Sequence, residues 1–314
     1  MWFAIGTLSR WLVFLGVLLM VGSLVFVSVV ARPGRGGGED DSLLEPDCFL
    51  PRFVAAKTAY AASLLLLLGA LGRISAQLAV FRDPFEPLGS ELALLLEATT
   101  WGKAWMAQVA LGLTAALLFA RVARALARGR GVGPTWCAAA IASAGLAFVP
   151  AFSGHAFGTQ DLRVLAVASD GVHVLAASAW LGTLAVIARV TVVSRRRGAA
   201  VGRPRLVSWI ARFSPLALGC AAVTVASGVF AAWLHLDAVS SLWLSTYGRR
   251  LLLKMGVLSV IIGLGAYNWK RSRGRIEAAG DPARLPGTVA WELAAALGIL
   301  LVTALLVDTP MPME

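Results

Sequence analysis

Long runs of apolar residues alternate along the chain with short polar connections. Eight of these runs are long enough to be transmembrane helices, because the roughly 30 Å apolar core of a bilayer needs about 20 apolar residues per helix. None shows the alternating pattern of a membrane barrel strand, and unpaired backbone groups are too costly in lipid for irregular structure. We therefore predict an all-α, polytopic membrane helical bundle. Its helices are expected near residues 8–30, 53–72, 103–120, 135–152, 164–188, 208–235, 249–267 and 290–307.

The composition agrees with a membrane protein. Of the 314 residues 58% are hydrophobic and only 14% are charged, and the mean hydropathy of +0.77 is beyond the usual range of soluble domains. Arg10 and the apolar run after it also resemble a secretory signal, but the run is longer than a typical signal core, so we expect it to stay as a helix. The cysteines Cys48, Cys137 and Cys220 form no C-x-x-C pair, which argues against a disulfide framework or a zinc knuckle.

Basic residues are concentrated in alternate connections, which explains the net charge of +11. Of the 28 Lys and Arg residues, 20 lie in or beside the connections after the first, third, fifth and seventh predicted helices, for example Arg195, Arg196 and Arg197. Cytoplasmic connections of membrane proteins are enriched in Lys and Arg. We therefore predict that these connections are cytoplasmic, that both termini are extracytoplasmic, and that nucleic acid is not a partner.

Three segments of the first half match the second half in the same order and with the same orientation in the membrane. The first two matches have an offset of 160 residues and the third an offset of 146. The matches pair Gly22 with Gly182, Arg52-Phe53 with Arg212-Phe213, and Thr100 with Thr246. We predict one domain, residues 1–314, built from two parallel four-helix halves, residues 1–152 and 153–314, that are related by an axis along the membrane normal.

The duplication shows which polar residues only one half contains. The first half has Arg10 where the second has Asp170, and Val13 where the second has His173. Within the second half, Asp170 and His173 lie one helical turn apart on the same face of the fifth predicted helix. At 1.5 Å per residue, His173 lies roughly 16 Å from the outer end of that helix, close to the middle of the bilayer. Ionisable side chains at this depth are costly, so they are candidates for function by default.

The two other histidines are predicted to lie on the outer side of the membrane. His155 follows a Phe-Ser-Gly sequence at the end of the fourth helix, and His235 ends the sixth helix. Imidazole binds copper, zinc, iron and nickel, and a thioether such as that of Met106, near the outer start of the third helix, favours Cu(I). We take His155, His173, His235 and Met106 as candidate metal ligands, with His155 and His173 as the central pair.

Each candidate also has a structural interpretation. The histidines could donate structural hydrogen bonds, and the methionine could fill a gap in the packing. Asp170 could bind a metal, orient His173, which is our preferred interpretation, or pair with a cation such as Arg10 or Lys254. Asp170 and Lys254 are thus candidates for groups that support the metal site or exchange protons. The sequence lacks the motifs of nucleophilic, zinc-protease and phosphate-binding enzymes, so we expect no enzymatic activity.

Two motifs in the second half are specific enough to indicate a family. They are SGHA at residues 153–156 and the pattern D-x-x-H-x-L-A-A-x-x-W-L-G from 170 to 182. On these motifs, and on weaker matches over nearly the whole length, the chain resembles the copper-resistance D (CopD) family of bacterial inner-membrane proteins. The resemblance implies eight transmembrane helices, copper handling, and copper ligands at His155 and His173.

The resemblance also implies a function. It suggests transport of copper, as Cu(I) or Cu(II), across the bacterial inner membrane, with a small periplasmic copper carrier as a partner and membrane lipid around the helices. We expect copper to meet His155 first, to pass to His173 and to leave toward the basic cytoplasmic end. Two alternatives stay open. One is a b-type haem redox protein, since pairs of histidines between helices bind haem. The other is a copper-delivery factor that does not transport the ion.

Overall fold

The computed structural model describes residues 1–32, 46–83, 85–152, 162–198, 201–236, 238–278 and 288–307. Within these ranges the chain contains no β-strand, and eight helical segments are long and apolar enough to cross a membrane. The predicted all-α polytopic bundle is thus confirmed. The helices are α1 (Trp2–Val25), α2 (Pro46–Phe81), α3 (Leu88–Ala93), α4 (Thr100–Ala127), α5 (Gly133–Phe152), α6 (Arg163–Ala177), α7 (Thr183–Arg196), α8 (Arg203–His235), α9 (Ser241–Leu244), α10 (Thr246–Ala278) and α11 (Thr288–Val307).

Three single π-helical turns extend or join these helices. They are η1 (Phe26–Val30) after α1, η3 (Leu94–Ala98) after α3, and η5 (Ser178–Gly182) between α6 and α7. Through η5, helices α6 and α7 form one continuous span. Such turns insert an extra residue into an α-helix and change the direction in which the following side chains point.

The helices run beyond their apolar cores. The second predicted helix, 53–72, lies inside a span from Phe49 to Phe81. A helix can continue into the headgroup region because its backbone hydrogen bonds are internal at any depth. The segment 73–81, expected outside the second helix, is therefore the last part of α2. It brings Arg73 beside α4, where its Nη1 atom donates a hydrogen bond of 2.5 Å to Gln108 Oε1.

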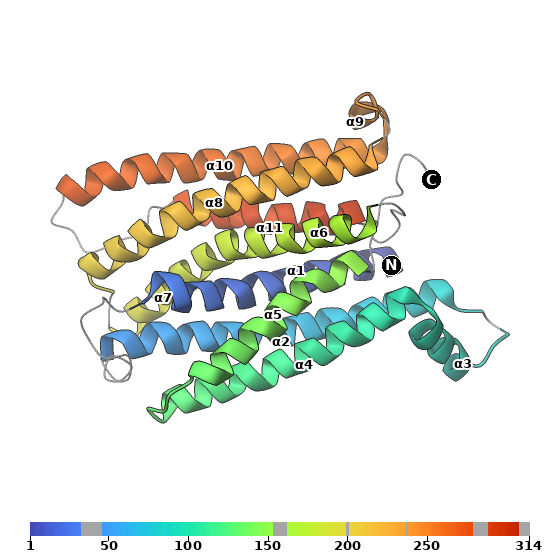
Figure 1. Cartoon of the computed structure of the whole chain (residues 1–314), viewed down its shortest axis with the longest axis horizontal. Helices are drawn as coiled ribbons and strands as arrows, with labels where there is room; N and C mark the ends of the chain where they lie inside the picture. The colour runs from blue at the N-terminus through green and yellow to red at the C-terminus, as the bar shows by residue number, and fades with distance from the viewer. Residues whose placement is uncertain are drawn as a thin grey trace.

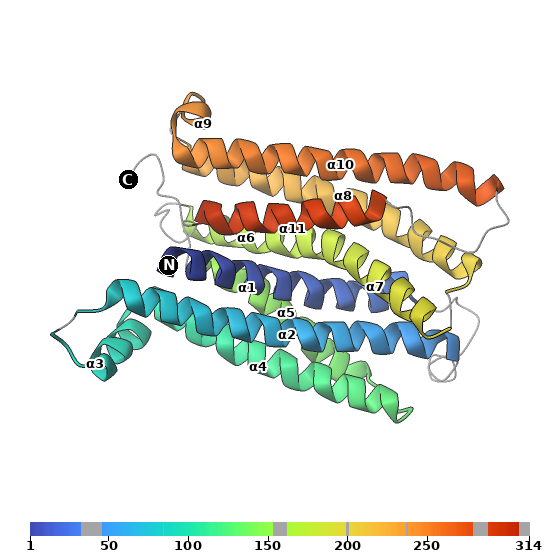
Figure 2. The ribbon, with the colours of Figure 1, turned by 180° about the vertical axis from the view of Figure 1, so that it is seen from behind.

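Helix α1 lies at the centre of the bundle. It packs against α2 and α5 on one side and against η5, α7 and α11 on the other, as Figures 1 and 2 show from opposite directions. In the most apolar part of α1, 61% of the residues are buried, against 11% for α8 and 17% for α10. Few residues in the most apolar parts of α8 and α10 are therefore buried within the chain.

The two halves touch where α1 crosses η5, at two glycines. A Cβ atom added to Gly22 would overlap the backbone of Gly182, and one added to Gly182 would overlap the carbonyl group of Leu18. The Thr183 hydroxyl donates to the Gly22 carbonyl at 3.4 Å. Only residues without a side chain permit backbones to approach this closely. The predicted repeat aligns the two glycines, and residues on a two-fold axis are expected to meet in this way.

Other aligned positions make matching contacts at the starts of α4 and α10. The Thr99 hydroxyl accepts a hydrogen bond from the Gly102 amide, and the Ser245 hydroxyl accepts one from the Gly248 amide, each at 2.9 Å. Both glycines pack closely against the short helical segment that precedes them. These contacts support the duplication, which stays a prediction.

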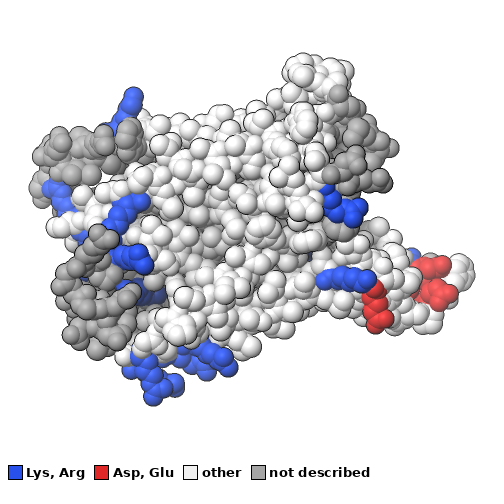
Figure 3. All heavy atoms as spheres, in the orientation of Figure 1, with Lys and Arg blue, Asp and Glu red and all other residues white. Residues whose placement is uncertain are grey.

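The two ends of the bundle differ in charge. The start of α1 and the end of α11 lie at the same end as α3 and α9 (Figure 1). On the face drawn in Figure 3, Lys and Arg side chains gather mainly at the opposite end, acidic side chains lie near α3, and an almost uncharged band lies between. A band of this kind suits the apolar core of a bilayer.

Candidate functional site

His173 lies on the side of α6 that packs against α8. Its Nδ1 atom is 2.9 Å from the Ser227 hydroxyl oxygen, and the ring also interacts with the backbone of Thr224. A Cβ atom added to Gly228 would lie 3.6 Å from the Cε1 atom of the ring. On the other side of α6, Gly171 allows the ring of Phe148 from α5 to approach. The imidazole is therefore held against one turn of α8.

The hydrogen bonds of Ser227 assign the tautomer of His173. The serine hydroxyl has one proton, and it donates that proton to a carbonyl of its own helix, Val223 at 2.7 Å or Thr224 at 3.2 Å, as serines inside helices commonly do. The hydroxyl oxygen then accepts from His173, so Nδ1 carries the ring proton and Nε2 carries the lone pair. The Nε2 atom is thus the acceptor nitrogen of the ring. It can therefore donate its electron pair to a metal ion.

A lysine and a tyrosine from α10 join this group. Lys254 interacts electrostatically with both Asp170 and His173, and Tyr247 interacts with Asp170. Tyr247 is buried, and the other three side chains are partly buried. Opposite charges attract strongly in an apolar medium. Asp170 therefore interacts with Lys254, whereas Ser227, and not Asp170, is the side chain that hydrogen-bonds to His173.

Of the other candidate ligands, only Met106 has a described side chain. His155 lies outside the described residues, and His235 ends α8 with a side chain that is also outside them. Met106 lies on α4, which packs against α2, α5 and η3, and its side chain is 39% exposed. Among the described residues, no group of three or more His, Cys, Asp or Glu side chains could hold a metal ion. Within the described site, His173 is thus the candidate ligand.

Sequence reasoning missed two side chains of this site. Ser227 gave no signal, because a serine in a membrane helix usually bonds only to its own backbone. For Tyr247 the predicted repeat offers a signal, because it aligns this residue and Lys254 with two neighbouring residues of the first half. The offset of 146 residues relates Tyr247 to Trp101, and it also relates Lys254 to Gln108. In the predicted repeat, the first half thus has a tryptophan and an amide side chain at these two positions, but Val13 at the position of His173.

Both halves of the chain match families of known proteins. Residues 2–164 match the family model described as copper resistance protein D-like, N-terminal domain. Residues 207–306 match the model described as copper resistance protein D. The chain is 27% identical, over 219 residues, to the copper transport protein CutJ of Bacillus subtilis (strain 168). That match covers 69% of this chain but only 38% of the relative's length. No solved structure matches the chain.

Proposed function

The chain belongs to the copper resistance protein D family, and from this premise we propose that it imports copper across the bacterial inner membrane without enzymatic chemistry. The family match gives a copper-related function at a membrane. The direction of transport, the inner membrane as location and the path through the bundle are our proposal.

The observation that carries this proposal is the position of the His173 ring and the tautomer that its hydrogen bond favours. Its ring is fixed in the bundle by Ser227, and its Nε2 atom carries the lone pair. Imidazole nitrogen binds copper ions, and a hydrogen bond from the other ring nitrogen orients the ring and raises its basicity as a ligand. A neutral imidazole is also much less costly to keep in a membrane than a charged one.

We propose that copper reaches this ring from the end of the bundle that holds the start of α1 and the end of α11. We take this end as extracytoplasmic because 20 of the 28 Lys and Arg residues lie in or beside the connections at the other end. His155 is the first ligand on this path, on sequence grounds alone, and a small periplasmic carrier protein supplies the ion. Asp170 supplies the negative charge that a cation needs inside the membrane, and Lys254 balances that charge while the site is empty.

Removal of the His173 imidazole tests the proposed path. We expect the purified protein to bind Cu(I), and we expect His173→Ala to lower the affinity by at least roughly tenfold, since one of few ligands is lost. His155→Ala is expected to have a similar effect. The measurements are Cu(I) competition with a chromophoric chelator in detergent and uptake of radioactive copper into proteoliposomes.

The same measurements separate the rival functions. Copper binding without uptake by the wild-type protein would contradict transport and favour a delivery factor. A Soret absorbance band in protein purified from cells would indicate haem. If both histidine variants bound copper as the wild type does, neither histidine would lie on the copper path.

Loss of the Ser227 hydroxyl is expected to weaken copper binding without abolishing it. Ser227→Ala removes the acceptor that holds the Nδ1 proton of His173, and loss of such a supporting hydrogen bond typically lowers metal affinity roughly 10- to 100-fold. Ser214→Ala is the matched control, because Ser214 makes the same bond to its own helix, at 2.8 Å to the Ile210 carbonyl. Equal Cu(I) affinities of the two variants would show that Ser227 does not position the ring.

A further inference from the structure

A carboxyl group lies buried between α10 and α11, two helices that run side by side in Figures 1 and 2. Glu292 is only 5% exposed, and its Oε1 atom accepts a hydrogen bond from the side-chain amide of Asn268. A Cβ atom added to Gly265 would lie 3.9 Å from the same oxygen. Glu292 and Asn268 thus form a small polar group at the interface of two membrane helices.

Glu292 lies close to the cytoplasmic boundary of the membrane. At 1.5 Å per residue it is about 6 Å from the start of α11. The α11 span has 19 residues and is about 28 Å long, so it just crosses the apolar core of the bilayer. The connection that precedes it carries Lys270, Arg271 and Arg273, and we take this end as cytoplasmic. The carboxyl group is therefore inside the apolar core but near cytoplasmic water.

An apolar layer separates this group from the polar group around His173. On α10, Lys254, Ile261 and Asn268 follow one another at intervals of seven residues, so they lie on nearly the same face of the helix. Lys254 and Asn268 are about 21 Å apart along the helix axis. Between them Ile261 is 1% exposed and belongs to an apolar cluster that includes Trp180. The two polar groups therefore lie toward opposite sides of the membrane.

Burial disfavours an ionised Glu292. A carboxylate in an apolar medium is costly unless a cation pairs with it, and it otherwise takes up a proton and becomes neutral. Lys254 is a cation that interacts with Asp170. The described polar partner of Glu292 is the Asn268 amide, which is neutral. The surroundings of Glu292 thus favour the protonated carboxyl group.

The titratable groups on the helices around Glu292 lie on exposed positions or far along the helix axis. Helix α11 packs against α10, α1 and α7. The titratable side chain of α1 is Arg10, near its outer end. The exposed ones at the cytoplasmic end of the other two helices are Arg189, Arg195, Arg196, Tyr267 and Lys270. Water screens charges at such positions, so they compensate a buried carboxylate poorly.

We propose that Glu292 is a proton-binding site that exchanges its proton with the cytoplasm. The Asn268 amide donates to Oε1, so Oε2 carries the proton while the carboxyl group is packed between the helices. When the start of α11 admits water, the O–H bond breaks, the proton passes to water and the carboxylate is left hydrated. Proton binding at Glu292 does not depend on copper. Its coupling to copper import rests on the function proposed above.

Infrared spectroscopy tests the proton site. The full-length protein in lipid nanodiscs is measured from about pH 5 to pH 9, and the carbonyl band of protonated carboxyl groups is followed. We expect a band at neutral pH that is lost in Glu292→Gln, a variant that keeps an acceptor for the Asn268 amide. Glu97→Gln is the matched control, because Glu97 is exposed and is ionised at neutral pH. This control should leave the band unchanged.

A second variant separates a proton site from a merely structural contact. Asn268→Leu removes the donor to Oε1, so the Glu292 band should remain but move to a higher frequency, because hydrogen bonding weakens a carbonyl bond. If no band depended on Glu292 anywhere in the pH range, the carboxylate would be ionised in the folded protein, and the proposal would be overturned.

A further arm tests the coupling to copper. Proteoliposomes are loaded with a pH-sensitive dye, and Cu(I) is added outside. We expect copper uptake by the wild type to change the internal pH, and Glu292→Gln to lose this change while it binds Cu(I) as the wild type does. Equal pH changes in both proteins would contradict the coupling. A Glu292-dependent band without copper uptake by the wild type would contradict the proposed transport and support the proton site.

Discussion

Replacement of Gly182 by alanine is expected to lower the free energy of unfolding by about 3 kcal/mol or more, a large part of the roughly 5–15 kcal/mol that stabilises a typical protein. The added Cβ atom would overlap the Leu18 carbonyl and lie 3.1 Å from the Gly22 Cα atom. These are backbone atoms, so they cannot rotate away, and α1 must separate from η5. The separation also loosens the apolar cluster that Trp180 forms with residues of α10 and α11. The melting temperature in detergent measures the effect.

Gly219→Ala is the matched control for this prediction. Gly219 lies within α8 on an exposed surface, and a Cβ atom added there meets nothing within 4 Å. Because alanine favours a helix more than glycine does, this variant should melt at the same temperature as the wild type or higher. If Gly182→Ala and Gly219→Ala had the same melting temperature, the close approach of the two halves would not be a feature of the folded protein in solution.

Removal of one charge of the Asp170–Lys254 pair is expected to destabilise the protein by about 3–5 kcal/mol, because the remaining charge is left in an apolar surrounding without compensation. Lys254→Met leaves the Asp170 carboxylate, and Asp170→Asn leaves the Lys254 ammonium group, which also faces His173. The double variant Asp170→Asn/Lys254→Met removes both charges and should be more stable than either single variant. Melting temperatures of the four proteins measure the coupling.

The two single variants are expected to change the affinity for Cu(I) in opposite directions. Lys254→Met removes the positive charge that interacts with His173, so Cu(I) should bind more tightly than in the wild type, whereas Asp170→Asn should bind it more weakly. Cu(I) affinities of the purified variants test this.

The stability prediction has its own contradicting outcome. If the effects of the two single variants on stability were simply additive in the double variant, the two charges would not interact in the folded protein.

The candidate site was only partly predictable from the sequence. Asp170 and His173 stand out because ionisable residues are rare within apolar runs, and their spacing places them on one face of a helix. The roles of their neighbours were not predictable, because they depend on which helices meet α6. Ser227 from α8 takes the hydrogen bond that Asp170 was expected to accept. Asp170 instead interacts electrostatically with Lys254 from α10.

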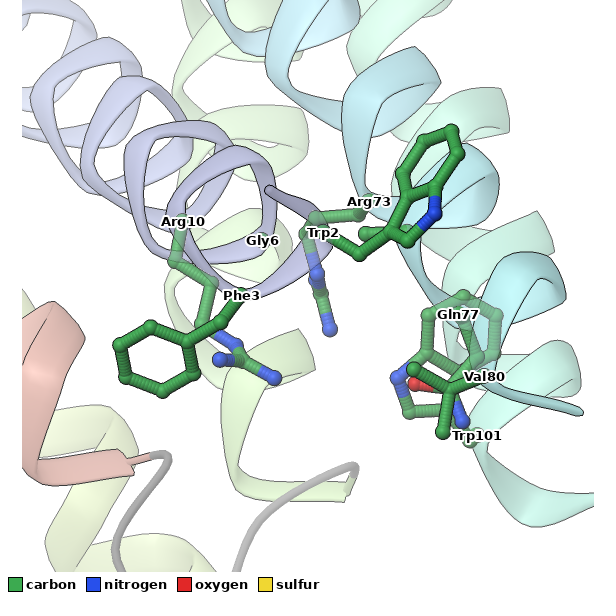
Figure 4. Close-up of a pocket in the computed structure, with 9 residues that line it drawn as sticks. Trp2, Phe3, Gly6, Arg10, Arg73, Gln77, Val80 and Trp101 are labelled. Carbon is green, nitrogen blue, oxygen red and sulfur yellow. The ribbon is translucent and has the colours of Figure 1, made fainter.

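The cavity of about 270 Å³ that Arg10 and Arg73 line (Figure 4) shows the same limit in the first half. Arg10 and Arg73 are far apart in the sequence, and the hydrophobic pattern does not place one beside the other. The continuation of α2 to Phe81 and the packing of α1 against α2 bring them together. The repeat marks position 10 as a difference between the halves, but it does not show that a second arginine lies beside it.

The sequence by itself determined the eight membrane helices and the distribution of charge along the chain, because these depend on local properties. A run of about 20 apolar residues must be helical in lipid wherever it lies in the fold. Only the tertiary structure decided which helices meet at Gly22 and Gly182, which side chain holds His173, and which cations share a cavity. Lipid solvates every apolar helix face about equally well, so helix pairing depends on close packing and on a few polar contacts, which hydrophobic patterns along one chain do not encode.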